Sequence, residues 1–339
     1  IALQHHRAGR LQEAEALYRQ ILQIQPDHPD ALHLLGVIAH HMGHHQIAVD
    51  QIKKAIALNP NIAEFHNNLG EAYRALGMNH EAVEGYRRAL ALKPGFAEAH
   101  YNLGNQLSDQ GLIEAAIMSY RNALVCKPHY AEAHNNLGNA LLGQGQAEEA
   151  VACYRRTLDI KPDYAVAHNN LGNACKAQGR LGEAIECYRR ALALAPGYAE
   201  AHVNLGNALC EQGSIEEALA CYRRALTIKP HFAEAHSNLL LALHYHPAED
   251  PALLFNLHKE WNDRYAKSLA AMIAPHPNRC GTDRPLRIGY VSADFGRHPV
   301  GYFLKPVLAA HDRSRVEVFC YSMVGKEDDF TAEIKGSAG

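Results

Sequence analysis

One spacing restricts the possible folds of this chain more than any other feature, because three residue types recur together every 34 positions. The prolines are Pro26, Pro60, Pro94, Pro128, Pro162, Pro196 and Pro230. The glycines are Gly9, Gly43, Gly77, Gly111, Gly145, Gly179 and Gly213, and the alanines are Ala14, Ala48, Ala82, Ala116, Ala150, Ala184 and Ala218. A fixed period of this length indicates a repeat protein, in which short helical units stack on their neighbours and share one continuous core.

Each recurring residue has a mechanical role in a unit of two helices, described here for the unit that starts at residue 131. Pro162 cannot continue a helix, so it ends the second helix and begins the next turn. Gly145 lies between the two helices, where a tight or left-handed turn favours a residue without a Cβ. Ala150 and Gly138 are small enough to let the paired helices approach closely. The second helices also carry large core fillers, namely Tyr86, Tyr120, Tyr154, Tyr188 and Tyr222.

This unit resembles the tetratricopeptide repeat. The signature is Ala131-Glu132-Ala133-His134-Asn135-Asn136-Leu137-Gly138, followed by Gly145, Ala150, Tyr154 and Pro162. The resemblance implies a mainly α fold, a right-handed α-solenoid that binds other polypeptides along its concave surface. We assign residues 1–246 to this superhelix, with a partial repeat at 1–28, six full repeats over 29–232 and a final helix at 233–246.

A row of asparagines is the candidate peptide-binding feature of the array. At 100° per residue, Ala133, Leu137 and Leu141 share the packed side of the first helix. Glu132, Asn136 and Asn139 fall roughly 140° away, on an open polar stripe. The equivalent residues form a ladder, Asn68, Asn102, Asn136, Asn170, Asn204 and Asn238. Asparagine is a mediocre helix former, and its amide can both donate to and accept from a peptide bond. The ladder therefore predicts a groove for extended chains; the alternative is that these residues only assist helix packing or solubility.

The histidines also repeat, and we expect them to be structural. His66, His100, His134, His168, His202 and His236 fall at the seam between helices, about 10 Å apart. At that separation they cannot converge on one metal ion, whose ligands lie near 2 Å. His40, His41, His44 and His45 contain two i, i+4 pairs, but Gly43 interrupts the helix and no third ligand is evident. We expect no metal site.

Charge and hydropathy limit the partners and the location. Lys plus Arg number 33 and Asp plus Glu 36, and a net charge of -3 provides no polycationic surface for nucleic acid. No apolar run is long enough to span a membrane. Cys153, Cys187 and Cys221 recur at equivalent sites, about 10 Å apart, which is too far for disulfides. They predict small buried side chains in a reducing, cytoplasmic compartment.

The pattern changes after the repeats. Residues 247–284 contain an amphipathic stretch, Leu253–Met272, that we expect to cap the open end of the solenoid, and then a Pro-rich linker. Leu286–Ser292 predicts a buried strand, a helix begins near Pro299, and Val316–Tyr321 predicts a second strand. This order is a βαβ unit, the start of a parallel sheet. No GxGxxG follows the first strand, so the dinucleotide-binding fingerprint is absent.

Residues 285–339 resemble the opening of the catalytic region of protein O-GlcNAc transferases and the related Spindly proteins. The resemblance rests on Arg287-Ile288-Gly289-Tyr290-Val291-Ser292-Ala293-Asp294-Phe295-Gly296-Arg297-His298-Pro299, together with His311-Asp312 and the Val316–Tyr321 strand. It implies an inverting glycosyltransferase with Rossmann-like lobes, a nucleotide-sugar donor such as UDP-GlcNAc, a Ser or Thr acceptor and no cofactor. It also marks His298 as a catalytic-site residue, beyond the carboxyl end of the first strand, where such sheets bind ligands. The alternative role for His298 is to cap the helix at Pro299.

The family's catalytic region is several hundred residues long, and here it occupies about 55. We therefore expect this chain to be an inactive piece of an active parent enzyme. Two alternatives remain: a tetratricopeptide adaptor without catalysis, and a Spindly-type protein O-fucosyltransferase that uses GDP-fucose. Residues 1–28 lack most of a first helix, which predicts an exposed apolar end and a homodimer through the solenoid.

Overall fold

The computed structural model describes residues 1–246, 250–272, 286–323 and 327–338. The chain forms two compact units, Ile1–Ser268 and Leu269–Gly339, which are described separately below. The boundary falls inside the segment that the sequence assigns to the cap and linker. None of the helices in the described ranges is long and apolar enough to cross a membrane.

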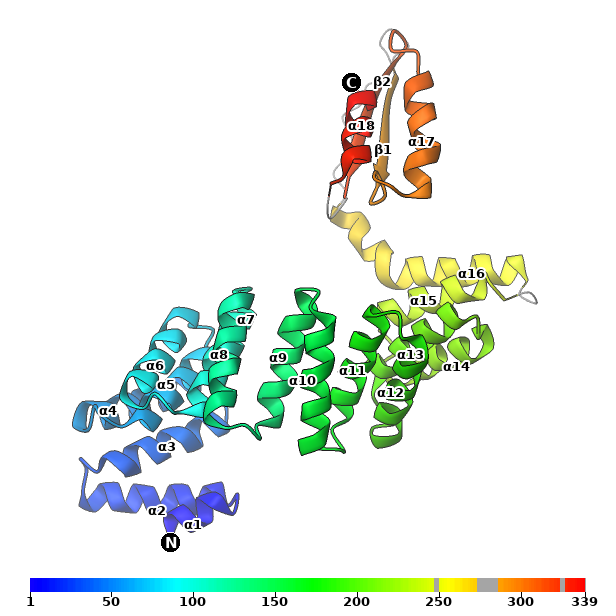
Figure 1. Ribbon diagram of the computed structural model, residues 1–339. Helices are drawn as coiled ribbons and strands as arrows, with labels where there is room; N and C mark the ends of the chain where they lie inside the picture. Colours follow the sequence, from blue (N-terminus) through cyan, green and yellow to red (C-terminus); the bar gives the residue numbers. More distant parts are fainter. Residues whose placement is uncertain (247–249, 273–285, 324–326, 339) are drawn as a thin grey trace. The chain divides into compact units, whose positions relative to one another are not determined.

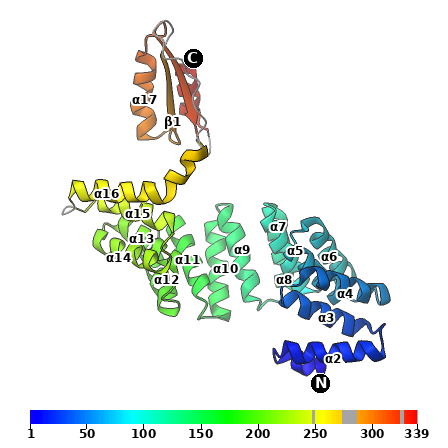
Figure 2. The ribbon, with the colours of Figure 1, turned by 180° about the vertical axis from the view of Figure 1, so that it is seen from behind.

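The first unit is a row of antiparallel helix pairs, each packed against the next (Figure 1). The same succession is visible from behind (Figure 2). The helices are α1 Ala2–Arg7, α2 Leu11–Ile24, α3 Pro29–His41, α4 His45–Leu58, α5 Ala63–Ala75, α6 Asn79–Leu92, α7 Ala97–Asp109, α8 Ile113–Cys126, α9 Ala131–Gly143, α10 Ala147–Ile160, α11 Ala165–Ala177, α12 Leu181–Leu194, α13 Ala199–Gln212, α14 Ile215–Ile228 and α15 Ala233–Leu243. This is the tetratricopeptide array that the 34-residue period predicts.

The turn glycines and the helix-contact glycines act by different physical means, as the sequence predicts. The seven periodic turn glycines all have positive φ, between 72° and 87°, a conformation that strains any residue with a Cβ. Gly138 instead lies inside helix α9, where an added Cβ would approach Cε1 of Tyr154 to 2.7 Å. The Tyr154 ring fills this space completely and is 0% exposed. The pairing of Gly138 with Tyr154 therefore fixes how closely the two helices of a repeat can pack.

The segment after α15 forms a shorter α-helix than the sequence predicts. Helix α16 spans Pro251–Trp261, and its first turn is capped by Asp250, whose carboxylate accepts a hydrogen bond from the Ala252 amide at 3.0 Å. A π-helical turn over Asn262–Ala266 and a 3-10 turn over Lys267–Met272 replace the expected continuation of the α-helix. Leu254 and Leu257 of α16 pack against the main core cluster of the array, so the expected capping contact is present.

The second unit contains the predicted βαβ arrangement. Strand β1 (Leu286–Ser292) pairs in parallel with β2 (Val316–Ser322), with Ile288 opposite Val318, and helix α17 (Pro299–Ala310) connects them. Helix α18 (Asp329–Ala338) follows β2. Phe295, Leu308, Val318, Phe330 and Ile334 form the core of this unit. The prediction that β1 is buried is wrong, because each strand of this two-stranded sheet has one neighbour and the residues of β1 stay exposed or half-buried.

Candidate functional site

The ladder asparagines form hydrogen bonds that run from one repeat to the repeat before it. All six are half-buried. The Asn136 amide nitrogen donates to Oδ1 of Asn105 at 2.9 Å and to Oη of Tyr101 at 3.2 Å. The Asn170 amide nitrogen donates to Oδ1 of Asn139 at 3.0 Å and to Oδ1 of Asn135 at 3.2 Å. The remaining contacts are Asn68 with His33 at 2.9 Å, Asn102 with Asn67 at 3.1 Å, Asn204 with Asn169 at 2.9 Å and Asn238 with Asn207 at 2.9 Å.

Three acceptors of this network, Asn105, Asn139 and Asn207, are themselves bonded to tyrosines of the core. The Tyr154 hydroxyl donates to Oδ1 of Asn139 at 2.7 Å, so this oxygen accepts both from the core and from the following repeat. Burial raises the pKa of Tyr154, so its phenol stays protonated as a donor. The same bond recurs as Tyr120 to Asn105 at 2.9 Å, Tyr188 to Asn173 at 2.7 Å and Tyr222 to Asn207 at 2.8 Å.

The role of these acceptors is not evident from helix periodicity, which places Asn139 on the open stripe beside Asn136. The signal that identifies it is a second period: Asn105, Asn139, Asn173 and Asn207 each precede a core tyrosine by 15 residues. These hydrogen bonds show how the ladder asparagines can assist helix packing, which is the alternative role. The peptide-binding role of the ladder stays a prediction.

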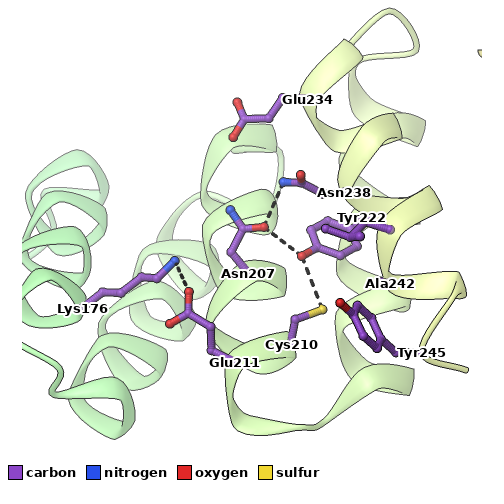
Figure 3. A pocket seen from close by; sticks show the side chains of 10 residues that line it. Lys176, Asn207, Cys210, Glu211, Tyr222, Glu234, Asn238, Ala242 and Tyr245 are labelled. Atoms are coloured by element: carbon purple, nitrogen blue, oxygen red, sulfur yellow. Dashed lines mark hydrogen bonds and ion pairs between the residues drawn. The ribbon is translucent and has the colours of Figure 1, made fainter. Parts of the chain in front are cut away.

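Two hollows open beside ladder residues in the first unit. One has a volume of about 280 Å³ and is lined by Asn68 and Asn102. The other, of about 390 Å³, lies against the last repeats and is lined by Asn207 and Asn238 (Figure 3). Depressions lined by half-buried amides offer donors and acceptors beside apolar surface, a combination that suits an extended polypeptide.

The periodic histidines bond to the turns, in agreement with their predicted structural role. Nε2 of His134 lies 3.0 Å from the carbonyl oxygen of Pro128, to which it donates. Equivalent contacts join His66 to Pro60 at 2.8 Å, His100 to Pro94 at 2.9 Å, His168 to Pro162 at 2.9 Å and His202 to Pro196 at 3.1 Å. His236 departs from the series, because Arg264 donates to the Pro230 carbonyl oxygen at 3.4 Å.

The histidine cluster near the first turn is arranged differently from the expected i, i+4 pairs. Helix α3 ends at His41 and α4 begins at His45, so the expected partners lie on separate helices. The close pair is His40 and His45, whose Nδ1 atoms are 3.3 Å apart. Within the ranges that the structure describes, no group of three or more His, Cys, Asp or Glu side chains is arranged to hold a metal ion.

The periodic cysteines are half-buried, where full burial was expected. Burial raises the pKa of each of Cys153, Cys187 and Cys221 to about 11. Such thiols stay protonated at neutral pH and react slowly. The described cysteines are all free thiols.

His298 lies directly before α17 and caps that helix. Its Nδ1 accepts a hydrogen bond from the Val300 amide at 3.3 Å and lies 3.8 Å from Oδ2 of Asp294. A neutral imidazole with this acceptor carries its proton on Nε2. Because about half of the side chain is exposed, Nε2–H is available to donate to a ligand. In this geometry His298 can orient or polarise an acceptor group, and it can act as a base through Nδ1 only after releasing the helix cap.

The loop that carries His298 is held by close packing. An added Cβ at Gly301 would overlap the carbonyl oxygen of Gly296, so the loop and the first turn of α17 are in direct contact. The Arg297 amide donates to the Asp328 carboxylate at 2.9 Å, which ties the loop to the start of α18. Phe295, 2% exposed, anchors the loop in the core. The position of His298 is therefore determined by contacts on both sides of it in the sequence.

The helix pairs, the turn geometry and the amide network define a tetratricopeptide-repeat protein, and the chain belongs to that family. The TPR repeat model matches residues 70–111, 104–145, 138–179, 172–213 and 206–244, and two Tetratricopeptide repeat models match residues 1–61 and 52–84. Residues 269–338 match Glycosyl transferase family 41. The chain is thus a repeat protein with a family 41 segment, related to O-GlcNAc transferase and SPINDLY proteins.

Two individual comparisons support the same relationship. The solved O-GlcNAc transferase of Thermobaculum terrenum, a mutant form, is 37% identical with a TM-score of 0.52, over 61% of this chain and 40% of that chain. A probable UDP-N-acetylglucosamine–peptide N-acetylglucosaminyltransferase SPINDLY of Hordeum vulgare is 41% identical over 96 residues. That alignment covers 28% of this chain and 10% of the barley protein, so the matched part is a small share of the relative.

A third relative matches more closely over a shorter stretch. The UDP-N-acetylglucosamine–peptide N-acetylglucosaminyltransferase of Caenorhabditis elegans is 60% identical over 38 residues, which is 11% of this chain and 3% of that protein.

Proposed function

We propose that this chain comprises the protein-binding arm and the first part of the catalytic domain of a protein glycosyltransferase. The enzyme would transfer N-acetylglucosamine from UDP-N-acetylglucosamine to Ser or Thr side chains. The observation that carries the proposal is the succession of a tetratricopeptide array and a family 41 segment within one chain. The names of the relatives, which describe N-acetylglucosaminyl transfer to peptides, support this choice of donor and acceptor.

His298 is the residue of this chain that we place at the catalytic site. In the transfer, the acceptor hydroxyl oxygen forms a bond to the anomeric carbon, the bond from that carbon to the nucleoside diphosphate breaks, and the hydroxyl proton passes to water or to the departing diphosphate. The exposed Nε2–H of His298 would orient the acceptor or the donor, because Nδ1 is engaged by the cap of α17. Substitution of His298 by Ala should therefore reduce transfer without preventing the array from binding protein.

The transferase activity is tested on the full-length enzyme with labelled UDP-N-acetylglucosamine and labelled GDP-fucose as competing donors. Transfer from the first donor supports the proposal, and transfer from the second alone assigns the protein to the O-fucosyltransferase alternative. If the protein transfers sugar from neither donor, the result favours the alternative of a tetratricopeptide adaptor without catalysis. We propose that residues 1–339 alone are inactive, which is supported by the 40% share of the solved Thermobaculum terrenum enzyme that the chain covers. Sugar transfer by the purified chain would contradict this.

We place the polypeptide substrate along the ladder asparagines. Three of them, Asn102, Asn204 and Asn238, have no hydrogen bond to the side-chain oxygen within the described residues, so this acceptor is open to a peptide N–H. The test is the affinity of the chain for a labelled unfolded protein, carboxymethylated α-lactalbumin, before and after all three are changed to Ala. The control is Thr157→Val, which removes the 3.0 Å hydrogen bond that the buried Thr157 hydroxyl donates to the Cys153 carbonyl oxygen. Equal binding by the triple variant, the control and the parent chain would refute the ladder role.

Two further parts of the proposal concern association and location. We propose that the chain self-associates through its N-terminal end, where Leu3 and Ile24 are 44% and 84% exposed. A monomer by light scattering at tens of micromolar would contradict this. We also propose a cytoplasmic location, which is supported by the free thiols of the described cysteines.

A further inference from the structure

A carboxylate at one place in the repeat forms an ion pair in three repeats. Within the described residues, Glu132 and Glu234 at the same place have no ion pair, and of these two only Glu234 also lacks the lysine in the sequence. In three repeats, a Glu in the first turn of the first helix pairs with a Lys that follows the second helix, 29 residues later. The pairs are Glu64–Lys93 at 2.7 Å, Glu98–Lys127 at 3.1 Å and Glu200–Lys229 at 3.3 Å. Glu234 occupies the same place in α15, but the residue at the lysine position is Asp263, which pairs with Lys267 at 3.2 Å. In the described part of the chain, Glu234 has no ion pair.

Glu234 lines the pocket of about 390 Å³ next to the last repeats (Figure 3). Asn238 and Leu241 follow it at helical spacing along α15, Tyr245 lies in the turn after that helix, and all three line the same pocket. Leu241 is 58% exposed and Tyr245 is 68% exposed, although both are large and mostly apolar. The pocket therefore combines an open apolar surface with an unpaired carboxylate on one helix.

The charges around the pocket favour a cation. Its charged lining residues are Lys176, Glu211 and Glu234. Nζ of Lys176 lies 2.7 Å from Oε1 of Glu211, so the positive charge is already balanced. The charge left over is that of Glu234.

We propose that this pocket binds a Lys or Arg side chain of an extended polypeptide. The cationic group would pair with Glu234 and the aliphatic stem would pack towards Leu241, while Tyr245 offers apolar surface to a neighbouring part of the same polypeptide. The inference rests on the proposed role of the array in polypeptide binding and adds a preference for basic segments at the α13–α15 end of the groove. Neutral and acidic side chains lack a matching charge here.

The test compares two fluorescent peptides of Ser, Thr, Pro and Val that differ at their centre. One carries arginine there and the other carries citrulline, which has nearly the same shape without the charge. Binding is measured by fluorescence anisotropy with the whole chain at low and high salt. We expect the arginine peptide to bind about threefold to fivefold more tightly at low salt, and the difference to shrink as salt rises.

Three variants locate the effect. Glu234→Gln keeps the shape and removes the charge, so it should abolish the preference for arginine. Glu200→Gln is the matched control, because it alters the equivalent carboxylate one repeat earlier, which is paired with Lys229. Tyr245→Ala should weaken both peptides, since it removes apolar surface as well as the aromatic face.

The outcomes separate this inference from the function on which it rests. If the chain binds carboxymethylated α-lactalbumin but both peptides bind equally, the polypeptide-binding role holds and the basic preference is refuted. The inference is also refuted if Glu234→Gln and Glu200→Gln have the same effect. If neither the peptides nor the unfolded protein bind, the polypeptide-binding role fails and the inference fails with it.

Discussion

The close contact between Gly172 and Tyr188 makes Gly172→Ala a sharp test of how the repeats pack. An added Cβ would lie 2.5 Å from Cε1 of Tyr188, whereas carbon atoms in proteins are in optimal contact at about 3.5–4.0 Å. The ring cannot move aside easily, because it is 0% exposed and its hydroxyl is bonded to Asn173 at 2.7 Å. Overpacking of this kind costs about 1–3 kcal/mol, and alanine recovers up to about 1 kcal/mol of helix propensity.

We therefore expect Gly172→Ala to lower the free energy of unfolding by about 1–2 kcal/mol, and the melting temperature by roughly 2–8 °C. Thermal and urea unfolding followed by circular dichroism measure both quantities. Gly182→Ala in α12 is the control, because nothing lies within 4 Å of its added Cβ, and this variant should be equally stable or slightly more stable.

A double variant identifies the cause of the destabilisation. If the clash with the ring is responsible, adding Tyr188→Leu to Gly172→Ala should cost less than the sum of the two separate changes. The packing argument is refuted if Gly172→Ala is as stable as the parent chain, or if the two glycine variants change stability by the same amount and in the same direction.

Three further predictions follow from individual side chains. Burial lowers the pKa of His33 to about 4, so between about pH 6.5 and 4 the unfolded chain binds a proton that the folded chain does not. The free energy of unfolding should therefore fall as the pH drops through this window. His33→Gln should make the urea midpoint depend less on pH in the same range. Asn170→Ala removes hydrogen bonds to the preceding repeat and should lower the free energy of unfolding by about 1–2 kcal/mol, which urea unfolding measures. An unchanged urea midpoint would contradict a stabilising role of these bonds. Iodoacetamide should label exposed Cys126 well before Cys153, whose pKa of about 11 keeps it protonated at neutral pH, as mass spectrometry of the quenched reaction would reveal.

The sequence alone determines most of the fold because the repeat acts through local backbone chemistry. Glycine at each turn supplies the positive φ, and proline ends each second helix, so the helix pairs follow from spacing. The same local logic predicts β1, α17 and β2. It places His298 before the first turn of α17, where either proposed role, helix cap or site residue, is consistent with its position.

The tertiary structure decided which polar groups meet. Helix periodicity assigns Asn136 and Asn139 to one open stripe, yet Asn139 accepts from Tyr154 in its own repeat and from Asn170 in the next. The pairing of Asn170 with Asn139 joins residues on neighbouring repeats, and its distance of 3.0 Å depends on how closely two helices stack. An angle around one helix carries no information about that separation. A similar limit applies to Glu234: the sequence shows that Asp263 occupies the lysine position, but only the structure shows that no other cation among the described residues pairs with this carboxylate.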